Sequence, residues 1–172
     1  IPLSSLFAAS NLLPEEDNLW ALWDRLHLRY EVKPLQESGN FIKLLENNSL
    51  EPLEKLITWG EVKEAQREVS KVSMTTEVIE TLRQLRDDLK RAGFEPSERR
   101  FAESLQIIKA SAWLKGRDTV ALEDIRILQH VMWNRTEDIG KVERIVLELA
   151  NPLDRETFNL RDKLVGLVKE YD

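Results

Sequence analysis

The chain of 172 residues contains no cysteine and only two histidines, His27 and His130. The absence of cysteine excludes disulfide bonds and thiolate metal sites, and it weakly favours a reducing compartment. So few histidines also argue against a histidine-rich metal centre. We therefore expect no metal site built from the side chains of these residues.

Long apolar runs and an excess of basic charge are also missing. No apolar stretch approaches the ~20 residues of a membrane-spanning helix. The N-terminal IPLSSLFAAS lacks the basic residues that open a signal peptide. The 25 basic and 31 acidic residues give a formal net charge of -6, which does not favour nucleic-acid binding. With 42% hydrophobic and 33% charged residues, the composition predicts a soluble globular protein, which we expect to be cytoplasmic.

The first 34 residues have the pattern of an α/β segment. Residues 3–9 and 28–32 are short apolar runs that predict two strands, and the acidic residues between them predict the start of a short helix. Two strands cannot form a stable parallel sheet alone. We therefore expect a two-strand remnant of a parallel α/β sheet. Residues 3–9 should be disordered, paired with another chain, or completed by strands outside this sequence.

Beyond Pro34 the periodicity is helical throughout. Thr58 with Glu61 predicts a capping box, and Gly93 and Gly116 predict the ends of two helices. The sequence therefore predicts a mainly α fold in three parts. These are the end of an α/β core at 1–34, a helical bundle at 35–151, and from 152 to 172 a helix leading to a further C-terminal region.

Asn11 follows the first predicted strand directly. In doubly wound sheets, ligands bind just beyond the carboxyl ends of the strands. A neutral amide at that point can bind a γ-phosphate or orient an attacking water. Asn is equally suited to a simple turn, and this residue alone does not separate the two readings.

Asp24 and Arg25 come at the end of the predicted short helix. An exposed arginine there can reach a neighbouring subunit and neutralise charge on a transferred phosphoryl group, because its planar fork suits phosphate oxygens. A solvated pair at the helix end is the alternative. Arg29 is the rival candidate, but its place in a predicted strand leaves it less free to reach across an interface.

Ser97 predicts the cap of a strongly amphipathic helix whose first turn carries Arg99 and Arg100. Two arginines at a helix N-terminus are unfavourable without an anionic partner. A phosphate can be that partner, and so can one of the nearby glutamates Glu95, Glu98 and Glu103. The buried stripe of this helix is predicted to consist of Phe101, Leu105, Ile108 and Ala112.

Two segments together resemble a known pattern. The first, LFAASNLLPEEDNLWALWDRLHLRYEV at residues 6–32, resembles the stretch from sensor 1 to the arginine finger of MoxR-type AAA+ ATPases. The second, SERRFAESLQIIKASAWLKGRDTVALEDI at residues 97–125, is similar to the sensor 2 helix of the lid subdomain in that family. The segment from Val72 through HVMW at 130–133 is similar to the RavA-like branch.

The resemblance covers about residues 3–150 and implies roles for individual residues. Asn11 matches sensor 1, and Arg25 matches the arginine finger that acts on the ATP of the adjacent subunit. Arg99 matches the sensor 2 arginine, with Arg100 as the second choice. Residues 51–72 resemble the insertion that repositions the lid in the magnesium chelatase branch. Whether Arg99 acts on its own or a neighbouring nucleotide therefore stays open.

The resemblance also implies a hexameric ring, Mg-ATP, chaperone-like remodelling of proteins and a partner with a von Willebrand factor A domain. The 172 residues contain no G-x-x-x-x-G-K-[ST] phosphate loop and no apolar strand ending in paired acids for Mg²⁺. We therefore expect ATP and Mg²⁺ only in an intact parent protein, and no ATPase activity from these residues alone.

Two other functions compete with this reading. The chain could be a nucleotide-independent helical protein-interaction module, in which the arginines form only surface ion pairs. Nucleic-acid binding by the helical part is a third possibility, but the acidic balance counts against it.

Overall fold

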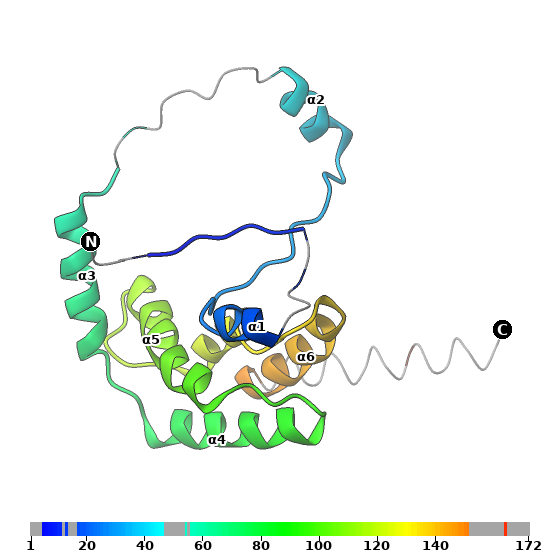
Figure 1. The fold of residues 1–172 in the computed structure, drawn as a ribbon. Helices are drawn as coiled ribbons and strands as arrows, with labels where there is room; N and C mark the ends of the chain where they lie inside the picture. Colours follow the sequence, from blue (N-terminus) through cyan, green and yellow to red (C-terminus); the bar gives the residue numbers. More distant parts are fainter. Residues whose placement is uncertain are drawn as a thin grey trace.

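The computed structural model describes residues 5–11, 13, 17–46, 54, 56–151 and 164. Helices dominate this part of the chain (Figure 1). The elements are, in order, α1 Asp17–Trp23, α2 Ser38–Glu46, α3 Trp59–Lys71, α4 Thr76–Arg91, α5 Glu98–Leu114, the 3-10 helices η1 Leu122–His130 and η2 Thr136–Asp138, and α6 Ile139–Ala150. The prediction of a mainly α fold is confirmed.

The hydrophobic core lies where helices α4, α5 and α6 meet η1. Both α5 and α6 pack against η1, α4 packs against α6, and α3 packs along the outside of α5. Large apolar side chains from all four elements are fully buried here, among them Leu85, Leu89, Ile108, Ile125, Leu128, Val142 and Val146. A core of this kind supplies most of the stability of short helices, which are marginal in isolation.

Capping signals predicted from the sequence mark the start of α3 and the ends of α4 and α5. At α3, Glu61 N donates to Thr58 Oγ1 at 3.3 Å and Thr58 N donates to the Glu61 carboxylate at 2.7 Å, which completes the capping box. Gly93 and Gly116, with φ of 86° and 73°, end α4 and α5 in the left-handed region. Residues 122–130 form the tighter 3-10 helix η1, which ends at His130.

The cap of α4 gives a first testable expectation. Thr75 Oγ1 accepts a hydrogen bond from Val78 N at 3.3 Å. Thr75→Ala leaves that amide without its cap, so we expect a loss of about 1 kcal/mol in the free energy of unfolding. Urea denaturation measures it. Thr76→Ala, at the exposed first position of the same helix, is the matched control and should change stability by less than ~0.5 kcal/mol. Equal losses in both variants would contradict the capping role.

The predicted two-strand remnant is wrong. The described residues contain no strand, only an isolated bridge between Ser73 and Thr119. Residues 5–10 are exposed and irregular, with Phe7 94% exposed. In the other predicted strand, Arg29 N donates to His130 O at 2.9 Å, outside any ladder. A strand needs a neighbouring strand to accept its hydrogen bonds, and neither run has one here.

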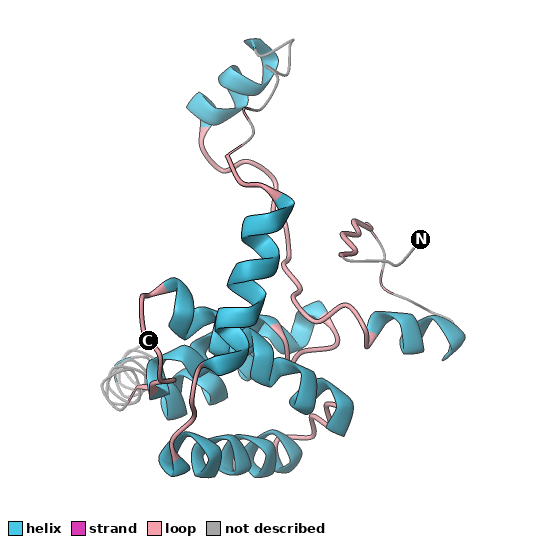
Figure 2. Ribbon diagram, turned by 90° about the vertical axis from the view of Figure 1, so that its left-hand side faces the viewer, coloured by secondary structure: helices cyan, strands magenta, loops and turns pink. Residues whose placement is uncertain are grey.

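Helix α2 lies away from the bundle in both views (Figures 1 and 2). All of its residues are exposed, including Phe41, Ile42, Leu44 and Leu45. Within the described part of the chain, no helix is long and apolar enough to cross a membrane. The helix predicted beyond residue 152 lies outside the described residues apart from Leu164, which is helical.

Candidate functional site

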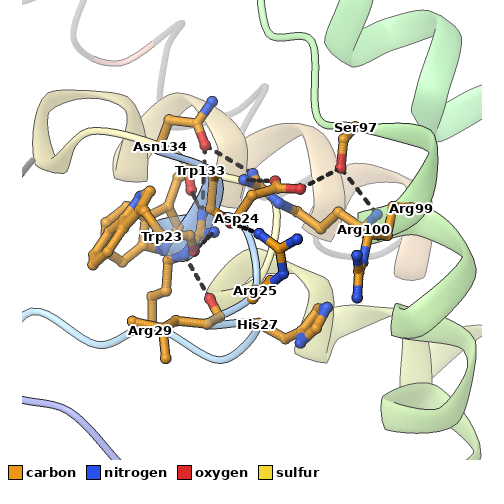
Figure 3. Close-up of polar contacts among 12 residues, drawn as sticks. Trp23, Asp24, Arg25, His27, Arg29, Ser97, Arg99, Arg100, Trp133 and Asn134 are labelled. Carbon is orange, nitrogen blue, oxygen red and sulfur yellow. Dashed lines mark hydrogen bonds and ion pairs between the residues drawn. The ribbon is translucent and has the colours of Figure 1, made fainter. Parts of the chain in front are cut away.

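The segment that follows α1 is bound to the bundle by a buried arginine. Arg29 is 4% exposed. Its Nε donates to Leu26 O and its Nη2 to Trp23 O, both at 2.8 Å. Its Nη1 donates to Trp133 O, in the loop after η1 (Figure 3). Arg29 therefore fixes the turn after α1 and attaches it to the bundle at the same time.

Aromatic rings surround this arginine. The Arg29 guanidinium lies 4.7 Å from the centroid of the Trp23 ring, and Trp23 meets Trp133 edge to face at 6.2 Å. Burial, together with the nearby Arg100 guanidinium, lowers the pKa of Arg29 to about 9. That value lies above neutral pH, so the group stays charged and its hydrogen bonds to the carbonyls are charge-assisted.

A second contact joins Asp24 to the start of α5. Ser97 Oγ donates to Asp24 Oδ2 at 2.7 Å, and Arg100 Nη2 donates to Asp24 Oδ1. Arg100 Nη1 also donates to Asn134 Oδ1 at 2.8 Å (Figure 3). Burial alone would raise the pKa of Asp24, but the Ser97 hydroxyl and the Arg100 guanidinium outweigh it and hold that pKa below its ordinary value. Asp24 is therefore ionised at neutral pH.

The buried face of α5 differs from the predicted one, because Arg100 is buried. The buried side chains of this helix are Arg100, Ser104, Ile108 and Ala112. Phe101 and Leu105 are only partly buried, although they pack against the core. The buried face of α5 therefore begins with Arg100, which forms an ion pair with Asp24, and not with the apolar Phe101.

The two arginines predicted to contact nucleotide, Arg25 and Arg99, are both exposed, and each has a partner close to it in the sequence. Arg25 is exposed, and its Nη1 donates to Ala21 O within its own helix turn. Arg99 is also exposed, and its Nε donates to Glu103 Oε1 at 2.7 Å. The other carboxylate oxygen of Glu103 meets His27 Nε2. Local pairing with Glu103, one of the alternatives considered from the sequence, is thus present for Arg99.

The predicted site residues are only partly brought together. The Asp24–Arg100 ion pair joins the segment of Arg25 to the segment of Arg99. Asn11 lies in an exposed bend, outside the hydrogen-bonded set around Asp24. Sequence reasoning missed Asn134 and the link from Asp24 to Arg100. No local signal could have revealed either contact, since the partners are 34 and 76 positions apart.

The exposed guanidinium groups of Arg25 and Arg99 are suited to bind an anion such as phosphate. Among the residues that the structure describes, no group of three or more His, Asp or Glu side chains is arranged to hold a metal ion. Arg25 and Arg99 can therefore place positive charge next to the phosphates of a nucleotide. The residues described here do not provide the phosphate loop or the acidic ligands that would hold Mg-ATP.

A comparison with known protein families finds a match within the helical part of the chain. Residues 77–146 match the family model described as AAA lid domain. The match runs from the first turn of α4 into α6, and it includes Arg99, Arg100 and Asn134. Over these residues the chain is therefore similar to an AAA lid domain.

Two archaeal proteins are similar over nearly the whole chain. Uncharacterized protein MJ0079 of Methanocaldococcus jannaschii is 30% identical over 170 residues, which is 99% of this chain and 44% of that protein. Uncharacterized protein MJ0812 of the same organism is 31% identical over 170 residues, 99% of this chain and 45% of that protein. The chain thus spans less than half the length of these relatives.

Proposed function

We propose that the chain is the C-terminal part of a MoxR-like AAA+ ATPase of the RavA-like branch. In the intact protein, ATP binding and hydrolysis would be coupled to chaperone-like remodelling of partner proteins. The observation that carries this proposal is the AAA lid match over residues 77–146. The Arg25 segment supports it, because Asp24 and Arg29, which flank Arg25, are bound to residues of that lid.

Arg25 is proposed to be the arginine finger, acting on the nucleotide of an adjacent subunit. Its side chain is exposed at the end of α1, whereas the rival Arg29 is 4% exposed and donates to three backbone carbonyls. Moving Arg29 out to reach a phosphate would leave those carbonyls and the Trp23 ring without their partner. The geometry therefore favours Arg25 over Arg29.

Arg99 is proposed to be the sensor 2 arginine. Its side chain is 55% exposed, and its guanidinium has one carboxylate partner, Glu103, which a phosphate could replace. Arg100 is 3% exposed and already bound to Asp24 and Asn134, so it is the weaker candidate. Action on its own subunit's nucleotide or on a neighbour's are both compatible with this placement.

Other parts of the proposal concern the intact protein. Asn11 would act as sensor 1, with ATP and Mg²⁺ held by a phosphate loop that these residues do not contain. Residues 1–34 would end the α/β core, 35–151 would form the lid, and 152–172 would lead to a further C-terminal region. The intact protein would form a cytoplasmic hexameric ring and work with a partner that carries a von Willebrand factor A domain.

An Arg99→Ala variant of the intact protein tests this assignment. Loss of one charge-assisted contact to phosphate costs about 1.5–3 kcal/mol, so we expect kcat/KM for ATP to fall about 10- to 100-fold. The matched control is Arg83→Ala on α4, since Arg83 is 61% exposed and also pairs with acids three and four residues away. Unchanged KM and kcat in Arg99→Ala would leave Arg99 as no more than a partner of Glu103.

One observation favours a second function, a nucleotide-independent protein-interaction module. Helix α2 exposes four apolar side chains, Phe41, Ile42, Leu44 and Leu45, each 52–61% exposed. Exposed apolar groups gathered on one short helix are typical of surfaces that bind another protein. ATP turnover by the intact protein separates the two functions, because an interaction module of this kind would have none.

A further inference from the structure

Two pairs of neighbouring residues face each other across the contact between the α1 segment and α5. Asp24 precedes Arg25 directly, and Arg99 precedes Arg100 directly. The inner members, Asp24 and Arg100, form an ion pair in which the arginine is buried and the aspartate is partly buried, while the outer members, Arg25 and Arg99, stay exposed. Consecutive Cα atoms are about 3.8 Å apart, so whatever fixes Asp24 and Arg100 also limits where Arg25 and Arg99 can move.

The ion pair has the features of a rigid connection. Arg100 is 3% exposed, and its two terminal nitrogens are bound to Asp24 and Asn134. Ser97 adds a third link, because its hydroxyl donates to Asp24 and accepts from Arg100 N at 3.1 Å. Because Arg100 is buried, opening the contact would leave its charge uncompensated, so the contact does not open easily.

A second anchor lies on the other side of Arg25. Arg29 ties the same turn to Trp133, which is next to Asn134 in the sequence. Arg25 is therefore held from both flanks, by Asp24 on one side and by Arg29 on the other. Both anchors end on the lid bundle, at α5 and at the loop after η1.

We infer that Asp24 and Arg100 are positioning residues that make Arg25 and the N-terminal turn of α5 one rigid body. This inference rests on the proposed function, since it gives Arg25 and Arg99 their nucleotide roles. A movement of α5 that follows the nucleotide state at Arg99 is then carried to Arg25 through the ion pair. The Asp24–Arg100 ion pair thus couples nucleotide binding at Arg99 to the position of the arginine finger, Arg25.

A double-mutant cycle in the intact protein tests the coupling. Displacement of a catalytic group by about 1 Å can cost 100-fold in rate, so Asp24→Asn and Arg100→Gln should each lower kcat about 10- to 100-fold. KM for ATP should stay within about twofold, because neither residue binds the nucleotide. The double variant should be no slower than the slower single variant, since both remove the same bridge.

Asp88→Asn is the matched control for this cycle. Asp88 is 24% exposed, close to the 26% of Asp24, and pairs with Arg91 on α4, away from the contact with α1. Its kcat should equal that of the unmodified protein. If Asp24→Asn does not fold, Asn134→Ala serves instead. It keeps both charges and removes one partner of Arg100, so kcat should fall less but in the same direction.

A distance measurement gives a readout that does not depend on ATP. Because the 172 residues contain no cysteine, spin labels can be placed at Leu22 and Gln106, after replacement of any cysteine elsewhere in the intact protein. We expect a single narrow distance distribution between the labels, broadened by Asp24→Asn or Asn134→Ala and unchanged by Asp88→Asn.

The outcomes separate this inference from the proposed function. A distribution unchanged by Asp24→Asn and Asn134→Ala would overturn the inference, as would a broadened distribution with unchanged kcat. An intact protein without ATP turnover would sink the proposed function and with it the coupling. The distances would then still show whether the ion pair holds the two segments together.

Discussion

Arg25→Ala should abolish steady-state ATP turnover by the intact protein while leaving nucleotide binding close to normal. An arginine finger stabilises charge that develops on the transferred phosphoryl group, and its removal lowers kcat by about 10³- to 10⁵-fold. Arg25 is exposed at the end of α1 and flanked by the buried contacts of Asp24 and Arg29. Its loss therefore removes a charge at the surface without disturbing the core. Measuring ATP binding and ATP turnover of the same variant separates an effect on catalysis from an effect on binding.

The control for this variant is Arg91→Ala. Arg91 is 75% exposed on α4 and forms a local ion pair with Asp88, so its loss should leave kcat within about twofold. Normal turnover in Arg25→Ala would sink the assignment of the finger to this residue. Arg29 could not then be tested as the finger by turnover alone, because its substitution should also lower the melting temperature through loss of its buried contacts.

Asp124→Asn should cost about 1.5–3 kcal/mol in the free energy of unfolding, the usual worth of hydrogen bonds to a charged group, because it removes the charge of a buried carboxylate. The Asp124 side chain is 0% exposed at the start of η1. Its carboxylate accepts from four groups, namely Ala121 N at 2.9 Å, Ser111 Oγ at 3.2 Å, Lys115 Nζ at 2.9 Å and Arg117 Nη2 at 2.7 Å. It therefore joins the end of α5 to η1.

The neighbouring Glu123 provides the control. It pairs with the same Lys115 and Arg117 but is 57% exposed, so Glu123→Gln should cost no more than about 1 kcal/mol. Urea denaturation of both variants measures the difference. Equal costs would mean that the burial of Asp124 adds nothing, which would contradict the argument.

The pH dependence of the Asp124 effect follows from its pKa. Burial would raise this pKa, but hydrogen bonds from Ala121 N, Lys115 and Arg117 outweigh it and hold the pKa below the ordinary 3.8. A carboxyl with a lowered pKa contributes stability that is fully present above its unfolded pKa of about 3.9 and lost as the pH falls through its folded pKa. The stability difference between the unmodified protein and Asp124→Asn should therefore shrink below about pH 4.

Local chemistry made the helices predictable. The Thr58–Glu61 capping box and the Ser97 cap depend on residues three positions apart, and both are present in the structure. The predicted strands at 3–9 and 28–32 failed, because a strand is stable only with a partner that the sequence pattern does not specify. Caps depend on neighbours in the sequence, whereas the backbone N–H of Arg29 donates to His130, a residue 101 positions further along the chain.

The candidate site was predictable only in part. The sequence favours Arg25 over Arg29 because Arg29 lies in a predicted strand. The structure has no strand there, and the burial of Arg29 is a different argument for the same preference. The roles of Arg25, Arg99 and Asn11 came from resemblance and remain predictions. The sequence does not show the ion pair between Arg100 and Asp24, which only the tertiary structure reveals.

The most direct test of the central claim is ATP turnover by a mixture of two inactive variants of the intact protein. One variant carries Arg25→Ala, and the other carries a disabled phosphate loop with Arg25 unchanged. If Arg25 acts across the subunit interface, mixed rings contain active sites with an intact loop from the first variant and an arginine finger from the second. Turnover of the mixture is then predicted to exceed the sum of the two separate rates. A mixture whose subunits exchange but whose rate equals that sum would contradict the account.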